Sequence, residues 1–331
     1  MSDIKLFQVD DGKAQELAAS AIAIEKTLQT LIERNLDPML GVRFVASEHS
    51  TGKAHSGRID TLGLDENGSP VIVEYKRSSN ENVINQGLFY LDWLLDHRAE
   101  FTLLAMKVLG SDVEEKVDWS APRLVCIAGD FTRYDEHAVS QIGRNIELYR
   151  YRWYEDGFFA LELVNSKAGM VEGRAAVTGP KPKQAYKTTV SEYLAQAGPE
   201  LRSLYESLDV FLLALGDDVS MKTTLYYLAY RRIKNFACVE IHPQINQLLV
   251  FLKVNPEEAI LEEGFARDVR EIGHYGTGDL EVRVDSLEDL ERAKPLIEKS
   301  LPRELIAHAT GSSRTGILGL ASAAHSGPHR R

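Results

Sequence analysis

The sequence predicts an α/β protein with two domains, and three observations lead to this fold class. First, 331 residues are about twice the length of an average domain. Second, stretches with the apolar spacing of helices are interspersed with short strand-like runs in both halves of the chain. Third, residues 166–189 are rich in Gly, Ala, Pro and Thr and show no sustained periodicity of apolar residues. We therefore expect one domain over 1–165, a basic flexible linker over 166–189, a smaller α+β domain over 190–310 and a disordered tail over 311–331.

Composition excludes several classes of protein. A chain with 44% hydrophobic and 26% charged residues is neither wholly disordered nor fibrous. No apolar run reaches the roughly 18–20 residues that span a bilayer, and the first residues lack the pattern of a signal peptide. We therefore expect a cytoplasmic protein without a membrane partner. The net charge of −11 argues against a protein that coats nucleic acid, but it allows local binding.

The elements of the first half follow from their spacing. Leu17, Ala21, Leu28 and Ile32 belong to a helical pattern of apolar residues that predicts an amphipathic helix. The pair Asn67-Gly68 is a strong hairpin signal between two strand-like runs. The predicted order continues with a helix and three strands, so the elements are a helix near 17–32, strands at 41–47, 58–64 and 71–77, a helix at 82–97, and strands at 123–130, 145–154 and 158–164.

The second half also mixes helices and strands. It begins with helical spacing over 200–216, continues through a hairpin over 236–254 and adds a strand over 280–284. A last helix is expected to start near Asp285 or Ser286, because each is followed three residues later by an acid, as in a capping box.

The predicted hairpin brings two acids together. A hairpin that is symmetric about Asn67 places Asp60 opposite Glu74, and residues opposite each other share a face with Cβ atoms about 5 Å apart. Lys76 shares the face of Glu74 because side chains alternate along a strand. Two carboxylates so close repel each other unless a cation lies between them. A few hard oxygen ligands are typical of Mg²⁺, which keeps several waters and also takes phosphate oxygens.

The first helix supplies a third acid. Glu25 falls within the apolar stripe of the predicted helix, whereas Glu33 falls beside Lys26 and Gln29 on its polar side. A carboxylate that faces a core is costly unless it is paired or bound to a metal. We therefore place Glu25, and not Glu33, beside the metal. This set of groups suits metal-assisted hydrolysis of a phosphodiester, in which Lys76 holds the attacking water or offsets charge on the phosphate.

The pattern D-(x)₁₃-E-x-K across a hairpin, after an acidic helix and before another helix, resembles the PD-(D/E)xK nuclease superfamily. It is most similar to the catalytic domain of NucS-type endonucleases, through the segments IEKTLQTLIERNL, GRIDTLGLDENGSPVIVEYKR and VINQGLFYLDWLLDH. The resemblance implies a restriction-endonuclease-like core, a mixed central sheet flanked by helices, that cleaves DNA with Mg²⁺ or Mn²⁺. It implies that Asp60, Glu74 and Glu25 bind the metal and that Lys76 is the catalytic lysine. The second half is similar to an uncharacterised α/β domain found behind such nuclease domains.

Further residues are candidates for binding nucleic acid or organising the site. Gln86 and Tyr90, four residues apart, are similar to a Q-x-x-x-Y element of the superfamily, although simple helix packing also explains them. Arg58 and Arg77 flank the acids. Two alternatives remain open at this stage: a nuclease fold without activity that binds nucleic acid or a protein partner, and action on RNA. Enzymes of this class often pair two active sites, which is compatible with a homodimer.

Overall fold

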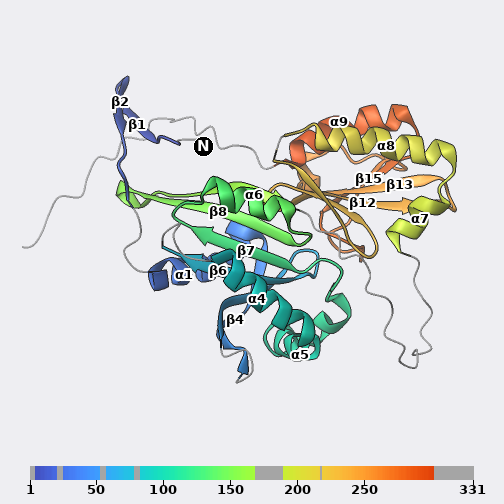
Figure 1. The fold of residues 1–331 in the computed structure, drawn as a ribbon. Coiled ribbons are helices and arrows are strands. Elements are labelled where there is room, and N and C mark those ends of the chain that lie inside the picture. Colours follow the sequence, from blue (N-terminus) through green and yellow to red (C-terminus); the bar gives the residue numbers. More distant parts are fainter. Residues whose placement is uncertain are drawn as a thin grey trace, which may run out of the picture. The chain divides into compact units, whose positions relative to one another are not determined.

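The structure is a computed structural model that describes residues 4–20, 25–52, 57–77, 83–167, 189–216 and 218–301. Within this part of the chain it contains a mixed seven-stranded sheet, an antiparallel six-stranded sheet and a separate two-stranded hairpin (Figure 1). Both larger sheets belong to one compact unit that ends at Leu301. Most of the predicted linker, 166–189, and the whole predicted tail, 311–331, lie outside the described residues.

The mixed sheet has the strand order β3-β8-β7-β6-β5-β4, and β9 also pairs with β8. The neighbours β6, β7 and β8 run parallel, whereas the other pairs are antiparallel. The strands are β3 (Ala19–Ser20), β4 (Val42–Ser50), β5 (Arg58–Asp65), β6 (Pro70–Lys76), β7 (Arg123–Ala128), β8 (Asn145–Tyr154) and β9 (Phe159–Lys167).

Helices cover both faces of this sheet. Val71, Val73 and Tyr75 of β6 face α1 and α2, and the alternate residue Ile72 faces α4 and α5 on the other side. The helices are α1 (Glu25–Arg34), α2 (Leu36–Leu40), α4 (Val83–Asp96), α5 (Arg98–Leu109) and α6 (Arg133–Gln141), with short 3₁₀ turns η1 (Ser111–Lys116) and η2 (Glu155–Gly157). Glu74 therefore points to the side of the sheet that α4 covers.

The β5–β6 hairpin has the predicted turn and register. Thr61 pairs with Val73 and Leu64 with Pro70, so that the two partners of each pair lie equally far from Asn67 along the chain, as expected for a hairpin centred on that residue. Gly68 has a φ of 75°, and a Cβ at this position would lie 1.9 Å from the carbonyl oxygen of Lys116. Only glycine fits such a position, which explains the Asn67-Gly68 pair.

The second sheet is antiparallel throughout, in the order β10-β11-β12-β13-β15-β14. Three helices bury one of its faces in a single apolar core. The strands are β10 (Ser220–Thr223), β11 (Leu228–Arg231), β12 (Asn235–His242), β13 (Gln247–Leu252), β14 (Ala266–Asp268) and β15 (Leu280–Val284). The helices are α7 (Val190–Gln196), α8 (Pro199–Leu213) and α9 (Leu287–Ser300), with a 3₁₀ turn η3 (Pro256–Glu258). The final helix begins after Ser286, whose side chain accepts the N–H of Asp289.

The fold class is confirmed: a mixed α/β sheet flanked by helices precedes an α+β domain. One expected element differs. The helix predicted from residue 17 begins at Glu25 in the structure, and the preceding chain forms β1 (Phe7–Asp10), β2 (Lys13–Glu16) and β3. No helix in the described ranges has both the length and the apolar character needed to cross a membrane.

Candidate active site

Asp60 and Glu74 meet at the open end of the β5–β6 hairpin. The backbone N–H of Asp60 donates to Oε1 of Glu74 at 3.2 Å, and the N–H of Tyr75 donates to Oδ2 of Asp60 at 3.1 Å. Both acids are thus held by backbone groups of the neighbouring strand. The regular pairing of β5 with β6 runs as far as Thr61 and Val73, and these two hydrogen bonds bring the two predicted residues together one position beyond it.

The two carboxylates are poorly solvated. Glu74 is fully buried, and its Oε2 has no hydrogen-bond partner in the described part of the chain. Burial and the neighbouring Asp60 carboxylate raise the pKa of Glu74 to about 9. Burial also raises the pKa of Asp60, although the Tyr75 N–H and the Lys76 ammonium oppose that effect. The positive charge near the two carboxylates is therefore too small to offset the cost of ionising both of them in this buried position.

Lys76 and Glu25 border this pair. Nζ of Lys76 lies 3.4 Å from Oε1 of Glu25, and the charges of both residues affect the pKa of Asp60. Glu25 is the first residue of α1, and its side chain is 37% exposed, so it does not face the core as the predicted stripe implied. It reaches the site from the end of the helix.

Sequence reasoning misplaced the polar face of α1. Gln29 is buried, and its Nε2 donates to the backbone oxygen of Asp60 at 2.9 Å and to Oε1 of Glu33 at 2.9 Å. Thr61 also donates to Oε1 of Glu33, at 2.7 Å, and lies 3.2 Å from the hydroxyl of Tyr75. Glu33 therefore faces the sheet, because the hydroxyl of Thr61 on β5 and the amide of Gln29 donate hydrogen bonds to it.

Gln86 and Tyr90 of α4 organise the start of β5. The hydroxyl of Tyr90 accepts the backbone N–H of Arg58 at 3.1 Å and Nε2 of Gln86 at 3.3 Å. Gly57 allows this approach, since a Cβ there would lie 2.6 Å from the Tyr90 ring. The two predicted helix residues thus contact the strand that carries Asp60.

A cavity of about 580 Å³ opens beside these residues and is lined by Glu48, Ser50, Gly52, Gly57, Arg58, Gln86 and Tyr90. Glu48 was not predicted. The pairs Ser47 with Thr61 and His49 with Ile59 place Glu48 opposite Asp60 on β4, where it has a φ of 53°. Its carboxylate pairs with Lys26 at 2.7 Å and Arg58 at 3.2 Å. The register between β4 and β5 would have predicted Glu48 as a site residue, because it places Glu48 opposite Asp60.

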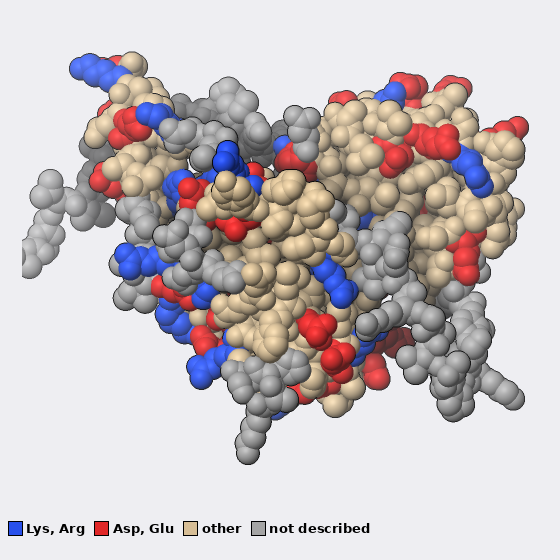
Figure 2. Space-filling view, in the orientation of Figure 1, with Lys and Arg blue, Asp and Glu red and all other residues tan. Residues whose placement is uncertain are grey.

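Two exposed cations pair with Glu48, which lines the cavity. The side chains of Lys26 and Arg58 are 56% and 66% exposed, and Figure 2 shows basic side chains interspersed with acidic ones near the elements that Figure 1 labels α1 and β4. Arg77 is exposed just after β6 and makes no hydrogen bond or ion pair with the other predicted site residues among those described. The structure therefore brings Arg58 to the site and leaves Arg77 at its margin.

The donor set suits a small divalent cation. Asp60 and Glu74 offer carboxylate oxygens, and the unpartnered, buried Oε2 of Glu74 is an acceptor that a cation would satisfy. No group of three His, Cys, Asp or Glu side chains arranged to hold a metal occurs in the described ranges. Two protein carboxylates are enough for Mg²⁺, because it keeps waters and takes substrate phosphate oxygens.

Residues 190–300 match the family described as "Domain of unknown function (DUF5655)". The chain is 28% identical over 307 residues to an uncharacterized protein of Haemophilus influenzae, covering 90% of this chain and 99% of that protein. Among solved structures, one called "Structure of EndoMS-dsDNA2 complex" is similar with a TM-score of 0.23 and 19% identity, over 40% of this chain and 47% of that one. The chain thus covers less than half of that structure's length, and the interpretation of the site rests on its own geometry.

Proposed function

We propose that this protein is a metal-dependent nuclease that hydrolyses phosphodiester bonds of DNA with Mg²⁺ or Mn²⁺. The observation that carries the proposal is the Asp60–Glu74 pair: Glu74 is buried, burial raises the pKa of both carboxyls, and the ammonium of Lys76 borders them. The resemblance of these residues to the PD-(D/E)xK motif supports the same conclusion.

Asp60 and Glu74 would hold the cation, with Glu25 as a further acid beside it. A bound divalent cation would supply positive charge next to the phosphate and make a nearby water more acidic. Lys76 would place its ammonium against the phosphate oxygens or the attacking water, since it is already held at the edge of the acid pair by Glu25. Gln29 fixes the backbone of Asp60 and so keeps its carboxylate in place.

DNA is the proposed substrate because the site is flanked by exposed cations in spite of the net charge of −11. Arg58 and Lys26 stand at the cavity and can bind phosphates on either side of the bond that is cut. Binding through these groups would weaken steeply as salt is added.

One observation favours a second function, a nuclease fold that binds nucleic acid or a protein partner without cutting it. The carboxylate of Glu25 pairs with Lys76, so that two of the four predicted catalytic groups neutralise each other. A cleavage assay distinguishes the two functions.

The experiment incubates plasmid DNA, single-stranded DNA and RNA separately with the protein and Mg²⁺ or Mn²⁺. Glu74→Gln and Lys76→Met remove the acid and the ammonium, and the exposed Glu206→Gln and Lys107→Met are matched controls. We expect the wild type and both controls to cut DNA and both site variants to lose about 100-fold or more in rate. Equal cutting by all five proteins, or none by the wild type, would refute the proposed activity.

A further inference from the structure

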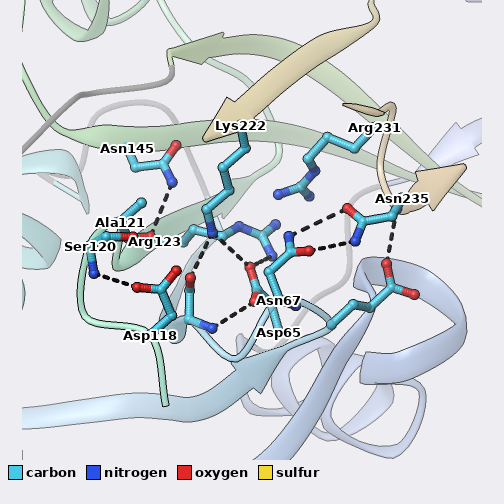
Figure 3. Close-up of polar contacts among 12 residues, drawn as sticks. Asp65, Asn67, Asp118, Ser120, Ala121, Arg123, Asn145, Lys222, Arg231 and Asn235 are labelled. Carbon is cyan, nitrogen blue, oxygen red and sulfur yellow. Dashed lines mark hydrogen bonds and ion pairs between the residues drawn. The ribbon is translucent and has the colours of Figure 1, made fainter. Parts of the chain in front are cut away.

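The turn of the β5–β6 hairpin is buried against residues of the second sheet. Its residues Asp65, Asn67 and Ser69 are at most 8% exposed, although hairpin turns usually lie in solvent. Figure 3 shows Lys222, Arg231 and Asn235, from β10, β11 and β12, directed at this turn and at Arg123 beside it. The hairpin that carries Asp60 and Glu74 is therefore held at its other end by the second domain.

Lys222 is the central contact. Its Nζ donates to Oγ of Ser69 at 2.7 Å. The same atom lies 3.4 Å from Oδ2 of Asp65 (Figure 3). Lys222 is itself buried, which lowers its pKa, and the Asp65 carboxylate opposes that effect. A buried lysine is rare unless it is paired.

Asn235 forms a second contact. Its Nδ2 donates to Oδ1 of Asn67 at 2.6 Å, and its backbone N–H donates to Oε2 of Glu66 at 2.9 Å. The hydroxyl of Tyr227 donates to the same Oδ1 of Asn67 at 2.9 Å. The side chain at the tip of the turn is thus bound by two residues of the second domain.

A buried ion-pair network extends these contacts. Arg123 makes two hydrogen bonds to Glu147, at 2.9 and 2.8 Å, and a third to Asp65 at 3.2 Å. Arg231 lies 3.4 Å from Oε1 of Glu147. Burial opposes ionisation of Asp65, but Lys222, Arg123 and Arg231 outweigh it and lower the pKa of Asp65 to about 2.

Asp65 links these contacts to the register of the hairpin. Its Oδ1 accepts the backbone N–H groups of Asn67 at 2.9 Å and Ser69 at 2.8 Å, which closes the turn. The turn sets the pairing of β5 with β6, and a slip of one residue would send a side chain to the opposite face. The pairing of Asp60 with Glu74 therefore depends on a turn whose shape Lys222 and Asn235 hold.

We propose that Lys222 and Asn235 are positioning residues of the active site, through which the second domain clamps the hairpin that bears Asp60 and Glu74. The link to cleavage rests on the proposed nuclease function, whereas the clamp itself does not. Replacing Lys222 takes one buried cation away from Asp65, which keeps Arg123, and removes the donor to Oγ of Ser69, so the turn is expected to loosen.

Hydrogen exchange followed by mass spectrometry on the full-length protein tests the clamp. The variants are Lys222→Met and the milder Asn235→Ala, and the control is Val250→Ala, which lowers the stability of the second sheet at a buried residue that does not contact the turn. We expect exchange of the peptide 58–76 to quicken by about tenfold in both clamp variants, since losing a hydrogen bond to a charged or buried group is worth roughly that factor. In the control this peptide should exchange as in the wild type. Unchanged exchange of 58–76 in Asn235→Ala and in any folded Lys222→Met would overturn the proposal.

Metal binding then shows whether the clamp positions the site. By calorimetry with Mn²⁺, well below the unfolding temperature of each protein, the clamp variants should bind about tenfold more weakly and the Val250→Ala control as tightly as the wild type. A role in stability alone would leave Mn²⁺ affinity unchanged and would overturn the positioning role. If the wild type binds Mn²⁺ but cuts no nucleic acid, the nuclease proposal fails while the exchange and binding results still decide the clamp.

Discussion

Replacing Glu74 by Gln is expected to stabilise the metal-free protein at neutral pH. Glu74 is fully buried beside Asp60, and burial together with that carboxylate raises its pKa from the ordinary 4.5 to about 9. Between these two values the unfolded chain has released the proton while the folded chain retains it. Stability is therefore lost as the pH rises from 4.5 towards 9.

The size of the effect follows from the two pKa values. At pH 7 the unfolded carboxyl lies 2.5 pH units above its pKa and the folded carboxyl is still protonated, which costs the wild type about 3 kcal/mol. Glutamine has the shape of the protonated acid and never ionises. Its Oε1 can still accept the N–H of Asp60.

Urea unfolding in the presence of a chelator measures the difference. Glu74→Gln should be more stable than the wild type by about 3 kcal/mol at pH 7 and by nearly nothing at pH 4. Glu206→Gln, at an exposed position, should follow the wild type at both pH values. A variant that is less stable than the wild type at pH 7, or a gain that does not change with pH, would refute the reasoning.

Three further predictions concern other parts of the structure. Glu48→Gln frees Lys26 and Arg58 from their ion pairs. Fluorescence anisotropy should then show that the slope of log DNA affinity against log salt concentration steepens by about 1 to 2, and an unchanged slope contradicts this. Asp65→Asn should cost about 2 kcal/mol at pH 7 and little near pH 2 in urea unfolding. The ionised Asp65 contributes stability above its ordinary pKa of 3.8, and this stability is lost as the pH falls to about 2. A loss equal at both pH values speaks against the network. Gly68→Ala should lower the free energy of unfolding by more than about 2 kcal/mol, because the new Cβ would meet the Lys116 carbonyl. Gly12 has a similar φ of 73° but open space around it, so Gly12→Ala should cost about 1 kcal/mol. Equal losses in urea unfolding contradict the steric argument.

The sequence predicted that Asp60 and Glu74 lie close together, because this contact is local. The Asn67-Gly68 turn fixes the pairing of its own two strands as far as Thr61 and Val73, and Asp60 and Glu74 follow directly on these two residues. The alternation of side chains then adds Lys76. No knowledge of distant segments is needed for this step.

The first helix was harder to predict because apolar residues that precede it in the sequence happen to continue its helical spacing. Leu17 shares the spacing of Leu28 and Ile32 but lies just after β2, outside α1 (Glu25–Arg34). The polar stripe of α1 was also misread. Gln29 is buried, since β5 offers it a backbone oxygen, and a helical pattern alone treats polar residues as exposed.

The clamp could not be predicted because its partners are far apart in the chain. Lys222 pairs with Asp65 across 157 positions, and Asn235 with Asn67 across 168. Either residue looks like an ordinary surface side chain in the sequence. Their burial follows from the packing of the second sheet against the hairpin turn.

Mn²⁺ binding by Asp60 and Glu74 is the most direct test of this account. Calorimetry of the wild type, Asp60→Asn and Glu74→Gln at several pH values would measure it. We expect the wild type to bind Mn²⁺ more tightly as the pH rises towards 9, because Glu74 must release its proton. Each variant should bind Mn²⁺ at least about tenfold more weakly than the wild type. Equal affinity in all three proteins, or an affinity that does not change with pH, would contradict the assignment of the site.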